Sequence, residues 1–203
     1  VFQYVRRFWG KRLSWMDLVI FCVFAWCIAA GVKQGLFSEI FRLLGCFFTT
    51  VFALHFFPMC AQFFRKFIPI APRYLEFFSY AFLGIFIVMS FKVMRDAMDL
   101  FRKVPEEGAE ISSRSRVWGA VLGGARAVLL SGLIFTAVVI LDHTPTLRAG
   151  QASFSGKILF HVSPTIYKGI HNNVIEKLFP NEQINSKLFR RFEDVKYLHK
   201  KMP

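Results

Sequence analysis

The chain has 203 residues, of which 55% are hydrophobic and 26 are phenylalanine, and its 26 Lys and Arg against 13 Asp and Glu give a formal charge of +13. Soluble domains spread both signs of charge over a polar surface, so this combination argues against a soluble fold. A nucleic-acid-binding domain would also be basic, but long uncharged apolar segments are foreign to one, so no nucleic-acid partner is expected. Apolar helices flanked by Lys and Arg are typical of membrane proteins, whose basic residues lie near anionic lipid headgroups.

Residues 1–14 interleave aromatic and basic side chains. On a helix, Phe2, Val5, Phe8 and Trp9 share one face, which predicts a segment that lies in the membrane interface. The alternative is a frayed terminus with a few aromatic residues. The side chains expected to contact lipid headgroups or a partner are Arg6, Arg7, Trp9, Lys11 and Arg12.

Four apolar segments follow, and a helix of about 20 apolar residues crosses a bilayer. The sequence therefore predicts an all-α, polytopic membrane protein with a four-helix membrane domain over residues 15–145. Pro58 is expected to kink or stop the second helix, because proline lacks the N–H that a helix interior needs; the span is expected to end before it, with an interfacial continuation to Ile68. The expected spans are about 15–33, 38–57, 75–94 and 119–141.

Two of these spans are entered through glycine-rich, charged segments, and glycines at helical spacing let two helix backbones approach closely. Glu39 and Arg42 are three residues apart, so they can partly neutralise each other on one helix face. An arginine at membrane depth should face protein or water, which suggests that Arg126 pairs with Glu39; the alternative is that Arg126 extends to the headgroups. The residues expected to pack or pair are Gly31, Lys33, Gly35, Glu39 and Arg42 in the first segment, and Gly119, Gly123 and Arg126 in the second.

Apolar density falls after the fourth span, and residues 146–203 are expected to form an amphipathic, basic tail. Residues 146–156 are expected to be a linker, and apolar residues at spacings of three and four predict an amphipathic helix over 158–179. A second, very basic helix is expected at about 184–198. RNA could bind it, but the membrane surface is the simpler partner for a segment tethered to the bilayer. Its candidate contact residues are Lys187, Arg190 and Arg191.

No arrangement of residues in the chain indicates catalysis or a metal site. The five histidines are scattered, and motifs such as H-E-x-x-H or G-x-S-x-G do not occur. The four cysteines lie in or beside apolar segments without metal-ligand spacing, so they are expected to pack as small apolar residues. We therefore expect no enzymatic activity, no metal and no cofactor.

The glycine-rich segments also carry a family resemblance. The stretch Trp15-Met-Asp17, followed by Gly31-x-x-x-Gly35-x-x-x-Glu39, resembles the opening of the colicin V production (CvpA-type) family. Arg116 followed by Gly119-x-x-x-Gly123-x-x-Arg126 is similar to a later signature of that family. The resemblance covers roughly residues 15–170, and the chain departs from it in its basic N-terminal extension, its long basic tail and Ala127, where members often have glycine. It implies a four-helix bacterial inner-membrane protein associated with toxin production or export and with envelope physiology.

The distribution of basic residues indicates an orientation. Seven Lys and Arg lie between Lys92 and Arg126, against three between Arg65 and Arg73, which favours a cytoplasmic side for residues 95–126 and periplasmic termini. The four basic residues near the N-terminus argue the opposite. The resemblance sides with periplasmic termini, since some members of the family bear an extracytoplasmic domain after the fourth helix.

Two functions are consistent with these features. The first is a non-enzymatic structural or scaffolding subunit of a membrane complex, either a homo-oligomer or part of a larger assembly, in contact with anionic lipid. The second is a small oligomeric channel or transporter, because charged, broken helix entries that repeat in two halves are typical of ion and substrate sites.

Overall fold

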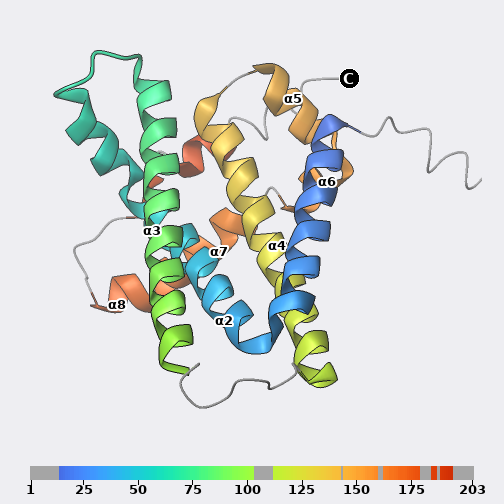
Figure 1. The fold of residues 1–203 in the computed structure, drawn as a ribbon. Coiled ribbons are helices and arrows are strands. Elements are labelled where there is room, and N and C mark those ends of the chain that lie inside the picture. The colour runs from blue at the N-terminus through green and yellow to red at the C-terminus, as the bar shows by residue number, and fades with distance from the viewer. Residues whose placement is uncertain are drawn as a thin grey trace, which may run out of the picture.

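The computed structural model describes residues 14–102, 112–142, 144–159, 162–178, 184–186 and 188–193, so the predicted interfacial segment lies outside it except for Ser14. Every regular element within these residues is helical, as the sequence predicts (Figure 1). The elements are α2 (Trp15–Arg65), α3 (Pro72–Arg102), α4 (Ser113–Leu141), α5 (Thr144–Ala152), α6 (Phe154–Leu159), α7 (Val162–Ile170), the π-helix η1 (His171–Ile175) and α8 (Glu176–Leu178).

α2 consists of two helical arms that meet at Gly35. This residue has φ 74° and ψ −177°, a backbone conformation that is essentially restricted to glycine. The first arm (residues 15–34) descends in Figure 1, and the second arm (residues 36–65) turns back from it. The break leaves the N–H of Leu36 without an intrahelical acceptor, and the hydroxyl of Ser115 in the first turn of α4 accepts it at 3.0 Å.

Three helices of the described chain, α2, α3 and α4, are long and apolar enough to cross a membrane. The first two expected spans, 15–33 and 38–57, both lie within α2. A four-span topology therefore requires that the two arms of α2 cross separately, and it stays a prediction.

α2 continues through Pro58 to Arg65, so the predicted span to residue 57 and its predicted interfacial continuation belong to one helix. Because proline has no N–H, the carbonyl oxygen four residues before it loses its donor within the helix. A helix that continues past a proline therefore leaves this carbonyl for another donor. The short connection 66–71 then leads to α3, which begins at Pro72. Proline suits the first position of a helix, since the N–H that it lacks has no partner there.

The region after α4 is also more helical than expected. The predicted linker over 146–156 is wrong: most of α5 and the first half of α6 occupy it. The single amphipathic helix expected over 158–179 is divided among α6, α7, η1 and α8. Pro164 lies in the first turn of α7, where a proline costs no hydrogen bond.

Two apolar clusters hold these helices together. The first joins the first arm of α2 to α4 and α6 through Met16, Ile20, Phe135 and Leu159. The second joins the second arm, α3, α4, α5, α7 and residues 188–193; its members include Leu54, Phe57, Tyr80, Leu133, Ile140, Tyr167, Leu188 and Phe192. α4 contributes to both clusters, so it is the central helix of the fold.

Candidate functional site: a charge pair at a glycine crossing

α4 crosses the first arm of α2 at a distance that only glycine allows. A Cβ atom on Gly31 would overlap the carbonyl oxygen of Gly119, and a Cβ atom on Gly119 would overlap the carbonyl oxygen of Gly31. One turn further along α4, a Cβ atom on Gly123 would lie 2.6 Å from the carbonyl oxygen of Cys27. We call these two backbone contacts, Gly31 with Gly119 and Cys27 with Gly123, the glycine crossing. It matches the close approach expected of small residues at helical spacing.

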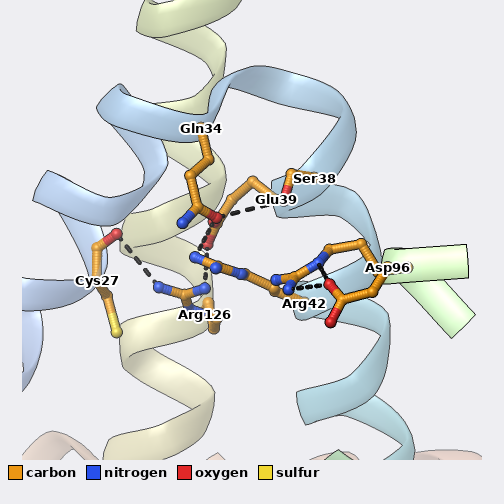
Figure 2. A network of polar contacts seen from close by, with 8 residues as sticks. Cys27, Gln34, Ser38, Glu39, Arg42, Asp96 and Arg126 are labelled. Atoms are coloured by element: carbon orange, nitrogen blue, oxygen red, sulfur yellow. Dashed lines mark hydrogen bonds and ion pairs between the residues drawn. The ribbon is translucent and has the colours of Figure 1, made fainter. Parts of the chain in front are cut away.

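An ion pair lies directly beside the glycine crossing. Arg126 Nη1 is 2.8 Å from Glu39 Oε1, and Arg126 Nη2 donates to the carbonyl oxygen of Cys27 at 3.4 Å. Glu39 is 0% exposed and Arg126 is 6% exposed. Figure 2 shows Arg126 reaching from α4 between Cys27 of the first arm and Glu39 of the second. One guanidinium group therefore contacts both arms of α2 across the break at Gly35.

Further charges surround this pair at the side facing α3. Arg42 Nη1 lies 3.8 Å from Glu39 Oε2, and its side chain is 24% exposed. Asp96 of α3 lies at the edge of the same group (Figure 2), where it pairs with its neighbour Arg95. Charges that leave water are tolerated in a protein interior when they pair with one another, so the cluster is arranged to neutralise Glu39 from two sides.

The other predicted site residues lie in different surroundings. Gly35 supplies the break in α2, and Lys33 is exposed beside it. Arg190 is exposed, whereas Arg191 contacts Glu76 of α3. The structure therefore brings together the glycines, Glu39, Arg42 and Arg126. The remaining predicted contacts, Arg6, Arg7, Trp9, Lys11, Arg12 and Lys187, lie outside the described residues.

Asp17 entered the sequence analysis only as part of the family resemblance, and the structure shows that it connects the start of α2 to α6. Its carboxylate accepts the N–H of Ser14 at 3.2 Å, as the second half of a capping box. It also accepts the N–H of Phe154 at 3.3 Å, and both the N–H and the hydroxyl of Ser155, at 3.0 and 2.6 Å. The Ser-x-x-Asp spacing signals the cap, but nothing in the sequence signals the contacts with α6.

Replacing Asp17 with asparagine is expected to destabilise the detergent-solubilised protein by about 1–2 kcal/mol. The amide keeps the size of the side chain but removes one of the two acceptor oxygens that serve four donors. The midpoint of thermal unfolding, followed by tryptophan fluorescence, measures the effect. The matched control is Asp96→Asn, since Asp96 has a half-exposed side chain that pairs with its neighbour Arg95 on the same helix; a shift as large as that of Asp17→Asn would contradict the prediction.

The chemistry available at the crossing is electrostatic. Among the described residues, no group of three or more His, Cys, Asp or Glu is placed to hold a metal ion. The Glu39 carboxylate is committed to Arg126 and Arg42, which leaves it poorly placed to act as a base. The arrangement is suited to fixing three helical segments in one relative position.

A family model described as "Colicin V production protein" matches residues 16–161. The matched region contains both glycine-rich segments, the ion pair and Asp17. Neither the curated proteins nor the solved structures gave a match to the chain.

Proposed function

Since the chain belongs to the colicin V production protein family, we propose that it is a non-enzymatic inner-membrane component of toxin production, export or envelope assembly. Its role is that of a structural or scaffolding subunit within a membrane complex. The family description supports the link to toxin production, and the three long apolar helices support a place in the membrane. The proposal includes four crossings, with the two arms of α2 counted separately, and periplasmic termini.

The observation that carries the scaffolding role is the buried pair of Glu39 and Arg126 at the glycine crossing. Buried charges that bind each other fix the geometry of the helices but are not free to bind a solute. Exposed aromatic side chains on the outer surface can contact lipid or other subunits: Phe21 and Trp26 of the first arm are 72% and 70% exposed. Aromatic side chains of this kind are enriched in protein interfaces.

Extraction from native membranes with a mild detergent tests this proposal. We expect the affinity-tagged full chain to elute in a discrete complex larger than the chain itself, with the same partners in repeated preparations. A parallel extraction from cells that express the untagged chain is the control for nonspecific capture. Elution as a bare monomer would contradict the scaffolding role.

The alternative, a small oligomeric channel or transporter, is supported by the two charged, glycine-rich segments that meet at the crossing. Purified protein in liposomes separates the two functions. Reproducible ion or solute flux that is lost in the Glu39→Gln variant would favour the channel, and the absence of flux together with a stable complex would favour the scaffold.

A further inference from the structure

The proline inside α2 leaves one backbone carbonyl group free. In an α-helix the carbonyl of a residue accepts the N–H four positions later, and four positions after Leu54 stands Pro58, which has no N–H. The side-chain amide of Asn185, far along the chain, donates to the carbonyl oxygen of Leu54 at 2.9 Å. Asn185 therefore supplies the hydrogen bond that Pro58 cannot make.

Asn185 uses all of its polar groups at this position. While its Nδ2 donates to Leu54, its Oδ1 accepts the N–H of Leu188 at 3.3 Å, which is the geometry of a helix N-cap. Its backbone N–H donates to the hydroxyl of Tyr167 at 3.2 Å, and that hydroxyl lies 3.0 Å from Nδ1 of His55. In the opposite orientation of the amide, Oδ1 would face the carbonyl oxygen of Leu54. The hydrogen bonds therefore identify which atom of the side-chain amide is the nitrogen and which is the oxygen.

The short helix that Asn185 caps is anchored to the other two long helices as well. Leu188 is 0% exposed and Phe192 is 8% exposed, and both belong to the second apolar cluster. Arg191 forms an ion pair with Glu76 of α3 and donates to the carbonyl oxygen of Ile140 at 3.0 Å. Ile140 lies in the last turn of α4, where carbonyl groups lack intrahelical partners and the helix dipole favours a cation.

We propose that residues 184–186 and 188–193 form a strap whose docking site is created by Pro58, and which closes over His55 and Tyr167 and opens as a single unit. Residues 188–193 are helical, but an isolated helix of this length is unstable in water. The helical structure of the strap therefore depends on its anchors, so loss of one anchor loosens the whole segment. This inference is independent of the scaffolding function.

Hydrogen–deuterium exchange of the full chain in detergent tests the strap through the amides of residues 188–193. Asn185→Ser keeps a hydroxyl that can cap the helix but is too short to reach Leu54, so the orphaned carbonyl should disfavour docking. We expect exchange of the strap to accelerate roughly tenfold, as a lost hydrogen bond that leaves a buried group unpaired implies. Unchanged exchange in Asn185→Ser would overturn the proposal.

Pro58→Ala makes the test specific. Alanine restores the N–H that pairs with Leu54 within α2, so in this background Asn185→Ser should change the exchange of the strap by no more than about twofold. Arg191→Gln is the matched control: it removes an anchor that does not involve Pro58, and it should accelerate exchange equally in both backgrounds. If Asn185→Ser has the same effect with proline and with alanine at position 58, the proline does not create the site and the proposal is wrong. Exchange of the α2 amides in each variant reports whether the helix itself is intact.

Discussion

Replacing Glu39 with glutamine is expected to cost about 3–5 kcal/mol of stability, because the guanidinium group of Arg126 would stay buried without its carboxylate. The structure gives Glu39 no exposure to solvent and places Arg126 at 2.8 Å. Arg126→Gln should cost a similar amount, since it leaves Glu39 with only the more distant Arg42. The midpoint of thermal unfolding in a mild detergent measures both changes.

The double variant, Glu39→Gln with Arg126→Gln, distinguishes a pair from two independent charges. Two neutral amides can bond to each other, so the double variant should be more stable than the sum of the single losses predicts. Arg42→Gln is the control, because its side chain is partly exposed and lies 3.8 Å from Glu39; it should have a small effect. Additive losses in the double variant would show that the contact contributes nothing as a pair.

Replacing Gly123 with alanine is expected to disrupt the glycine crossing, whereas the same change at the adjacent Gly124 should be harmless. A Cβ atom on Gly123 would lie 2.6 Å from the carbonyl oxygen of Cys27, a backbone atom that cannot rotate away. Nothing lies within 4 Å of a Cβ atom on Gly124. We expect Gly123→Ala to cost at least about 1–3 kcal/mol, as overpacking does, and Gly124→Ala to be neutral or slightly stabilising, since alanine favours a helix.

Thermal unfolding in detergent measures this pair of variants, and cysteine labelling gives an independent readout. Separation of α4 from the first arm should increase the reaction of the buried Cys27 thiol with a membrane-permeant maleimide in Gly123→Ala alone. Equal stability and equal labelling in the two variants would show that the backbones do not approach as closely as the structure indicates.

The long helices could be predicted from the sequence because their apolar segments are continuous and long. The helix boundaries that could not be predicted depend on contacts with residues far away in the sequence. Pro58 suggests a helix end by local rules, but α2 continues through it, and Asn185, 127 positions later in numbering, pairs with the carbonyl that the proline frees. Residues 146–156 are polar enough to suggest a linker, yet α5 and α6 pack against the start of α2 through Ser14 and Asp17.

The candidate site was largely accessible from the sequence because its signals are chemical and local. Glycines at helical spacing indicate a close helix contact, and an arginine within an apolar segment indicates a polar partner. Glu39 was an available partner for Arg126. The contacts of Asp17 with α6 were not accessible, because an acidic residue in the first turn of a helix is already explained by capping. The contact of Arg191 with Glu76 could not be predicted for a similar reason. Lipid headgroups already account for a basic, aromatic tail next to a membrane, so nothing in the sequence called for a protein partner.

The break at Gly35 bears on how the protein is made. Only one residue outside helical geometry separates the two arms of α2, so no hydrophilic loop is available to be translocated between them. On the proposed four-span topology, we expect the two arms to enter the bilayer together as a helical hairpin. Because a chain is synthesised from its N-terminus, both arms, including Cys27 and Glu39, are made before α4 brings Arg126 to them.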